Sequence, residues 1–185
     1  MKKAFTFIEI AVVVGVISIA LPTLYAIFFL ILQQQVKLLR LTEVKRQGTF
    51  LNDTLTTLVR NNATGIYKAQ NGLQVCSNAV SGDKSYTTGT LYFRDKQSNW
   101  FNFNLSSQKI ASVSSIFGAT ADLTSPRAPI KVFITSFTSK CSTTSYATPI
   151  VIFSYDMCFN INGSCGLAGD TVSLHFQPTV KLRNY

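Results

Sequence analysis

The sequence predicts an α+β protein in which one long N-terminal helix packs on a mainly antiparallel β-sheet head. Three observations predict this class. The stretch from Ile10 to Leu32 carries no charged residue. A second helical pattern follows it with no Pro or Gly before Gly48, and short extended runs separated by turn residues fill the rest of the chain.

The uncharged stretch is predicted to be a transmembrane helix. About 20 apolar residues span the hydrocarbon core of a bilayer, and Ile10 to Leu32 meets that length. Pro22 lies inside it and is expected to bend or loosen the helix, because proline lacks the backbone donor and clashes with the preceding turn. The remainder, about 150 residues, suffices for one compact head.

The second half of the helix is predicted to be amphipathic. Apolar residues recur at three- and four-residue spacings and basic residues lie between them, so one face is apolar. The pattern fades at Asn61-Asn62 and Gly65, which favour a helix end. A single helix from Phe5 to Asn62 is roughly 85 Å long. The apolar positions expected to face the head are Leu51, Leu55, Leu58 and Val59.

The head is predicted to be mainly β. The clearest signal is a hairpin, in which two aromatic-rich runs flank the loop-like residues 95–99. Long surface loops are expected at Ser77–Gly89 and Thr138–Thr148, which are rich in Ser, Thr, Asn and Gly. Pro178 is expected to split the last run. The expected strands are Thr90–Arg94, Trp100–Leu105, Gly72–Cys76, Lys109–Val113, Ile130–Phe137, Pro149–Tyr155 and Thr171–Leu182.

Composition excludes an intrinsically disordered chain, since 46% of the 185 residues are hydrophobic and only 14% are charged. The balance is basic, with 17 Lys and Arg against 8 Asp and Glu. The basic residues are dispersed rather than clustered. This favours a solvated surface over a nucleic-acid-binding face.

The four cysteines all follow the membrane segment, and their even number fits disulfides in an oxidising compartment. Of the three possible pairings we prefer Cys158–Cys165, because these residues flank the turn-forming pair Asn162-Gly163. Cys76–Cys141 then follows by elimination.

No enzyme, cofactor or metal site is expected. The sequence lacks a Gly-rich phosphate loop, a G-x-S-x-G motif and a metal-ligand cluster. The single histidine, His175, lies in an alternating pattern and is interpreted as a surface or core residue of a strand. A calcium loop is disfavoured but left open, because the spacing of its candidate ligands fits no compact loop. Those candidates are Asp156, Asn160, Asn162 and Asp170.

The most specific motif is at the start of the chain. Lys2-Lys3-Ala4 precedes Phe5-Thr6-Phe7-Ile8-Glu9, and the apolar block follows at once. This pattern resembles the leader of type IV pilins and type II secretion pseudopilins. Glu43–Gly48, Val59–Ala63 and the chain end Phe176–Tyr185 are similar to minor pilins of the J or W type. Ala4 stands where that family usually has Gly.

The resemblance implies that a prepilin peptidase cuts between Ala4 and Phe5 and methylates the new amine of Phe5. It also implies a partner for Glu9, since a carboxylate at the membrane end of an uncharged helix is costly alone. That partner is the amine of Phe5 in the same or a neighbouring subunit. The expected parts are a leader at 1–4, a transmembrane helix at 5–32, an amphipathic stalk helix at 33–65 and an extracytoplasmic β-rich head at 66–185.

The function implied is that of a minor pilin or pseudopilin that primes or caps a type IV pilus or a type II secretion pseudopilus. Its partners are then prepilin peptidase, other pilin subunits and the inner-membrane assembly platform. It starts as a single-pass cytoplasmic membrane protein and ends in a filament at the cell surface. A count of flanking Lys and Arg alone favours the opposite orientation; the processing motif and the cysteines favour export. Two alternatives remain open: a pilus-tip module that contacts DNA or an acidic surface, and an unrelated membrane-anchored β domain.

Overall fold

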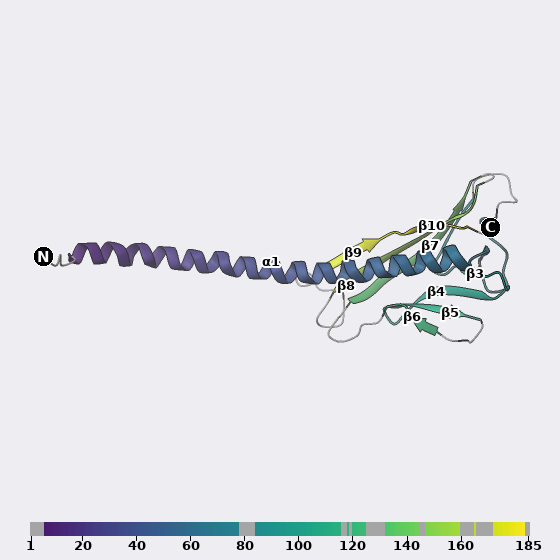
Figure 1. Ribbon diagram of the computed structural model, residues 1–185, viewed down its shortest axis with the longest axis horizontal. Helices are drawn as coiled ribbons and strands as arrows, with labels where there is room; N and C mark the ends of the chain where they lie inside the picture. Colours follow the sequence, from purple (N-terminus) through teal and green to yellow (C-terminus); the bar gives the residue numbers. More distant parts are fainter. Residues whose placement is uncertain are drawn as a thin grey trace. The chain divides into compact units, whose positions relative to one another are not determined.

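The computed structural model describes residues 6–77, 84–115, 118, 120–124, 132–144, 147–159, 165 and 172–183. One helix and ten strands occupy these ranges, and the strands form two antiparallel sheets (Figure 1). The predicted α+β class is confirmed. The elements are α1 (Phe7–Asn62), β1 (Gly65–Tyr67), β2 (Lys84–Thr88), β3 (Tyr92–Arg94), β4 (Trp100–Ser106), β5 (Lys109–Ser114), β6 (Thr120–Asp122), β7 (Val132–Thr143), β8 (Ile150–Phe159), β9 (Val172–Phe176) and β10 (Thr179–Lys181).

The chain divides into two compact units, residues 1–40 and 41–185. In the first unit α1 continues through Pro22. In the turn before the proline, Ser18 Oγ donates a hydrogen bond to the carbonyl of Val14, four residues earlier, over 2.7 Å. This bond is typical of a serine inside a helix. Every described side chain from Thr6 to Leu39 is exposed. This half of α1 is long and apolar enough to cross a membrane.

The first sheet has the order β1-β3-β4-β5-β6. The expected hairpin is its centre, with Arg94 opposite Trp100. The next hairpin joins β4 to β5 through Ser107 and Gln108 alone, and both adopt positive φ, 49° and 62°. A two-residue hairpin turn of type I′ has positive φ at both central residues, and Gly, Asn and Asp adopt this geometry most readily.

The second sheet has the order β10-β8-β7-β2, and β9 also pairs with β8. β9 and β10 pair with different stretches of β8, along the same side of that strand. Together they form one edge of the second sheet, which is interrupted at Pro178 as predicted. At the interruption the N–H of Phe153 donates to the carbonyl of Pro178 over 3.0 Å.

The two sheets pack through aromatic rings. Phe153 of β8 meets Phe103 of β4 edge-on, with ring centroids 5.8 Å apart, and Phe93 of β3 at 6.3 Å. All three rings are buried. Edge-to-face contacts of this kind add about 0.5–1.5 kcal/mol beyond the area buried.

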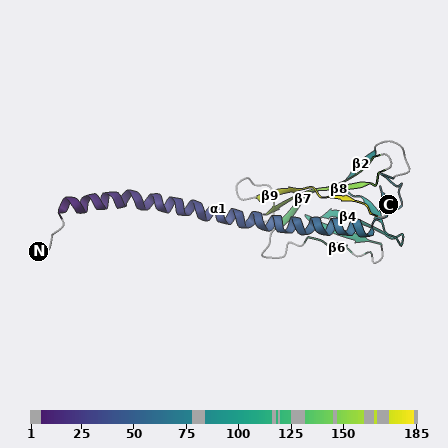
Figure 2. The same cartoon turned by 45° about the horizontal axis from the view of Figure 1, so that its top comes forward.

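The second half of α1 completes the core. Its buried residues follow a three- and four-residue spacing and share one cluster with residues of both sheets. This half of the helix runs beside both sheets in Figure 1, and Figure 2 agrees. The predicted stripe is confirmed for Leu51, Leu55 and Val59, whereas Leu58 is only partly buried. The structure adds Val44 and Gly48.

Tyr155 and Phe176 hold the helix to the second sheet. Their rings stack at 5.4 Å. The Tyr155 hydroxyl donates to the carbonyl of Gly48 over 3.1 Å and also bonds Asn52 Oδ1. Burial raises the pKa of the Tyr155 phenol, so it remains a donor across the physiological pH range.

Several expected segments differ from the structure. Gly72–Cys76 is not a strand and contributes only an isolated bridge between Gln74 and Tyr67. β2 lies inside the expected loop Ser77–Gly89, and β7 continues to Thr143 inside the other expected loop. These strands are rich in Ser, Thr and Lys, so their composition resembles that of a loop, and pairing with a neighbour decides their conformation.

The described cysteines form two disulfides, Cys76–Cys141 and Cys158–Cys165, with Cα atoms 6.2 Å apart in each. This is the pairing that the sequence analysis prefers. The first closes 65 residues and the second closes seven. Loop-closure entropy therefore assigns about 4 kcal/mol to Cys76–Cys141 and about 2 kcal/mol to Cys158–Cys165.

Gly48→Ala should destabilise the head. A Cβ at this position would overlap the Phe176 ring, and overpacking of a core costs about 1–3 kcal/mol. Helix propensity alone predicts the opposite, a gain of about 1 kcal/mol. Because the overlap involves three ring atoms, the packing cost exceeds the propensity gain, and we expect the free energy of unfolding to fall by about 1 kcal/mol. Denaturant unfolding of the full-length protein in detergent micelles, followed by near-UV circular dichroism, measures this change.

The matched control is Gly89→Ala, since a Cβ there meets no atom within 4 Å. Its free energy of unfolding should stay within about 0.5 kcal/mol of the parent value. A Gly48→Ala protein that is more stable than the parent would show that the helix does not pack on Phe176 as described.

Candidate functional site

Three places in the described chain carry features that function requires: the start of α1, a polar cluster on the second sheet, and a cleft beside the Cys76–Cys141 disulfide. Each lies within one of the two units. Their elements and side-chain partners determine what each can do.

Glu9 lies in the first turn of α1 and caps its own helix. Its Oε2 atom accepts from the backbone N–H of Thr6 at 3.4 Å and lies 3.5 Å from the Thr6 hydroxyl. Thr6 and Glu9 have the spacing of a capping box, in which an acidic residue at the third helical position satisfies the N–H of the cap residue. A carboxylate here also interacts favourably with the positive end of the helix dipole.

This cap is a role for Glu9 that the sequence analysis did not identify, although Thr-x-x-Glu is its usual signal. The expected partner, the amine of Phe5, and the cleavage position at Ala4 lie outside the described residues. The exposed apolar face that begins here is extensive. Phe7, Ile8 and the large apolar residues from Ile10 to Leu32 are all exposed.

The polar cluster lies on the outer face of the second sheet. Asp156 of β8 stands opposite His175 of β9, and His175 Nδ1 lies 2.7 Å from Asp156 Oδ1. His175 Nε2 lies 3.2 Å from Ser154 Oγ, and the Ser136 hydroxyl donates to Asp156 Oδ2. Strand alternation brings Ser154 and Asp156 to one face, because residues two apart point the same way.

The hydrogen bond from Ser136 lowers the pKa of the Asp156 carboxyl most, and the bond and charge of His175 lower it further, against a smaller effect of burial. The order hydroxyl, imidazole, carboxylate is that of a hydrolase triad. Here, however, the histidine and aspartate side chains are 54% and 44% exposed. β8 is paired on both sides in this stretch, so its amides are used in the sheet and are not directed at an oxyanion. The cluster links polar side chains of three neighbouring strands, β7, β8 and β9.

His175 is thus a surface residue of a strand, one of the two positions foreseen. Of the candidate calcium ligands only Asp156 is described; Asn160, Asn162 and Asp170 lie outside the described residues. In the part of the chain that is described, no group of three or more His, Cys, Asp or Glu residues is placed to hold a metal ion.

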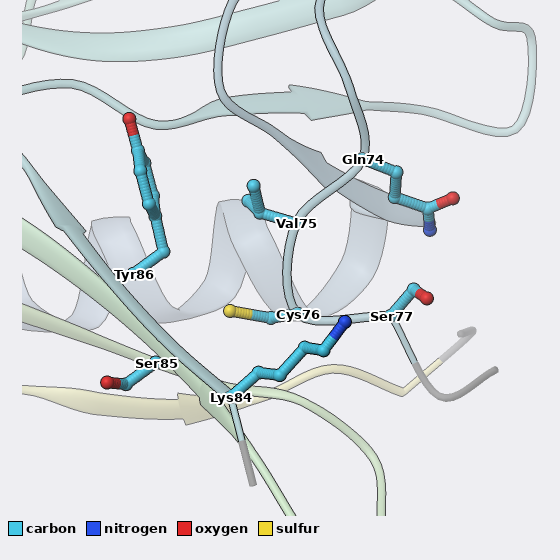
Figure 3. Close-up of a pocket in the computed structure, with 7 residues that line it drawn as sticks. All are labelled: Gln74, Val75, Cys76, Ser77, Lys84, Ser85 and Tyr86. Carbon is cyan, nitrogen blue, oxygen red and sulfur yellow. The ribbon is translucent and has the colours of Figure 1, made fainter. Parts of the chain in front are cut away.

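The third place is a cleft between β2 and the segment after β1 (Figure 3). Lys84 and Tyr86 extend from β2, and Cys76 carries the disulfide to β7. Lys68 Nζ lies 5.8 Å from the centre of the Tyr86 ring, a cation–π distance. The disulfide joins the segment after β1 to β7, and the Lys68 contact joins the same segment to the edge strand β2. The other lining residues are Gln74, Val75, Ser77 and Ser85.

The Asp156 cluster predicts a pH-dependent stability. A carboxyl whose pKa is lower in the folded protein stabilises it above the unfolded-state pKa, about 3.9 for Asp, and this stabilisation is lost as the pH falls through the lower folded value. Asp156→Asn should therefore reduce the loss of stability between pH 6 and pH 3. Thermal unfolding of the full-length protein over this range measures the difference.

Asp53→Asn is the matched control, because it removes the same charge from an exposed position of α1. It should unfold with the pH dependence of the parent. If Asp156→Asn also retained the parent's pH dependence, Ser136 and His175 would not stabilise the ionised carboxylate.

The comparisons with known proteins identify no relative. No family model, curated protein or solved structure matches the chain significantly. The residues of the chain itself therefore carry the functional assignment: the motif before Phe5, the carboxylate of Glu9, and the uncharged, exposed half of α1.

Proposed function

We propose that the protein is a minor pilin or pseudopilin, a non-enzymatic structural subunit that prepilin peptidase processes and that polymerises into a type IV pilus or a type II secretion pseudopilus. The observation that carries the proposal is a helix half that is uncharged from Ile10 to Leu32, exposed along its length, and headed by Glu9. A soluble protein does not leave so large an apolar surface uncovered. Lipid covers it first, and helices of other subunits cover it afterwards.

Glu9 supplies the reason for assembly rather than simple anchoring. A carboxylate at the bilayer centre costs about 3 kcal/mol, and less near an interface. An anchor gains nothing from this cost. In a bundle of identical helices, pairing of Glu9 with the amine of a neighbouring Phe5 offsets it and fixes the axial register of subunits. The capping contact with Thr6 leaves carboxylate acceptor sites unused, because an ionised carboxylate has about four.

Processing is the first test. The mature chain should begin at Phe5, with a methylated amine, in protein purified from its native membrane. Intact mass measurement and N-terminal sequencing read this directly. A chain that begins at Met1, or that is cut beyond the apolar stretch as a secretory signal would be, contradicts the pilin assignment and favours an unrelated anchored domain.

Assembly is tested with Glu9→Gln, which separates the two roles of the residue. Gln serves as well as Glu in a capping box, so the helix start is kept while the charge is lost. Glu9→Gln should insert into the membrane normally yet be depleted from sheared filaments, as judged by immunoblots of the membrane and filament fractions. Thr6→Val, which removes the capping hydroxyl and leaves the charge, should still assemble.

Normal incorporation of Glu9→Gln into filaments would contradict the charge-pairing role. Equal depletion of Glu9→Gln and Thr6→Val would show instead that the helix start, and not the charge, is what assembly requires.

A further inference from the structure

Three cationic side chains line one open cleft of the head. Arg60 comes from the last turn of α1, Lys181 is the last residue of β10, and Arg183 follows two residues later. Thr148 and Leu182 complete the lining. Figure 1 shows β10 approaching the end of the head where α1 ends. Two segments more than 100 residues apart in sequence thus bring three positive charges to one place.

The backbone fixes this convergence. Val180 and Leu182 are buried, at 0% and 2% exposure, and the N–H of Leu182 donates to the carbonyl of Pro149 over 3.2 Å. Because side chains alternate along an extended chain, Lys181 and Arg183 must both point away from the core. Lys181 and Arg183 point the same way because the residue before each of them, Val180 and Leu182, points into the core.

Among the described residues, no carboxylate balances the charges of the cleft, and none is in its lining. The described ion pairs of Lys and Arg, Arg46–Glu43 and Lys109–Asp122, involve none of its three cations. The end of α1 contributes a partial charge of only about −0.5. Three like charges that line one cleft raise the free energy of the empty protein, and an anion would lower it.

Thr148 adds a neutral donor at the same place. Its Oγ1 atom is buried and has no hydrogen-bond partner among the described residues. A buried hydroxyl without a partner costs about 1–3 kcal/mol. The atom is shielded from solvent in the empty protein, so a ligand oxygen accepts this hydrogen bond and removes the cost once the lining of the open cleft shifts on binding.

We propose that this cleft binds the phosphate group of an anionic ligand. Every polar side chain in the lining can donate a hydrogen bond, and the Arg and Lys side chains have no acceptor to offer. A phosphate brings several acceptor oxygens and a charge close to −2, and the guanidinium fork of Arg fits two of those oxygens. A carboxylate has two oxygens and one charge, and it would leave most of the excess positive charge unbalanced. This site does not depend on the proposed assembly role.

Pyrophosphate is the probe. Isothermal titration calorimetry of the full-length protein in non-ionic detergent micelles should show saturable binding of pyrophosphate. A titration with sodium chloride at the same ionic strength should show none. The triple variant Arg60→Gln, Lys181→Gln, Arg183→Gln should bind at least about tenfold more weakly, since hydrogen bonds to charged groups contribute about 1.5–3 kcal/mol each.

The matched control removes the same total charge elsewhere. Lys45→Gln, Lys96→Gln and Lys140→Gln change three exposed cations on α1, the β3–β4 loop and β7. This triple variant should bind pyrophosphate within about twofold of the parent, because none of the three cations lines the cleft and salt weakens the effect of exposed charges elsewhere on the surface. An equal loss in both triple variants, or no saturable binding by the parent, overturns the proposal.

Thr148→Val separates a ligand contact from a structural role. The change keeps the shape and removes a hydroxyl that has no described partner, so the protein should be as stable as the parent or more so. Pyrophosphate binding should weaken several-fold. Loss of stability with unchanged binding would show that the hydroxyl serves the fold and is not part of the site.

A second titration identifies the source of the phosphate. If a single-stranded oligonucleotide displaces pyrophosphate, and its affinity depends less steeply on salt in the cleft triple variant than in the parent, the ligand is a nucleic acid backbone. Failure to displace it excludes a nucleic acid backbone and leaves a small phosphate compound as the ligand.

Discussion

The apolar stripe of α1 that carries Val44, Leu51, Leu55 and Val59 is the surface on which the head depends. All four residues are fully buried in the cluster that joins both sheets. Each sheet has one face that must leave water, and the aromatic contact through Phe153 covers only part of it. Burial of a Leu or Val side chain contributes about 1.5–3 kcal/mol. The helix is therefore part of the head's core and not only its support.

The first half of the same helix packs on none of the described residues. The described residues from Thr6 to Leu39 are exposed, and the uncharged ones fill the length that a bilayer requires. The two halves of the helix therefore have different surroundings: the head covers the apolar stripe of the second half, and the apolar side chains of the first half are exposed. The buried positions of the second half serve folding, and the exposed positions of the first half are left for lipid and, under the proposed function, for other subunits.

The head carries two polar arrangements of different kinds. In the Asp156 cluster each charge meets a partner, as the contacts with His175 and Ser136 show, and this arrangement stabilises the surface of the second sheet. In the cleft at Arg60 the described side chains supply donors without acceptors. Balanced groups serve the fold; unbalanced ones raise its free energy and are expected where a ligand binds.

The sequence by itself determined the helix, its change from apolar to amphipathic, the central hairpin and the break at Pro178, because each depends on local periodicity or on a local backbone restriction. It also placed Glu9 at the head of an uncharged segment. Tertiary structure decided what has no local signal. β2 and the end of β7 are polar segments that become strands by pairing, and the turn at Ser107 and Gln108 lacks the residues that usually mark it. The cleft at Arg60 depends on residues distant in sequence, so only the folded chain brings its three cations together.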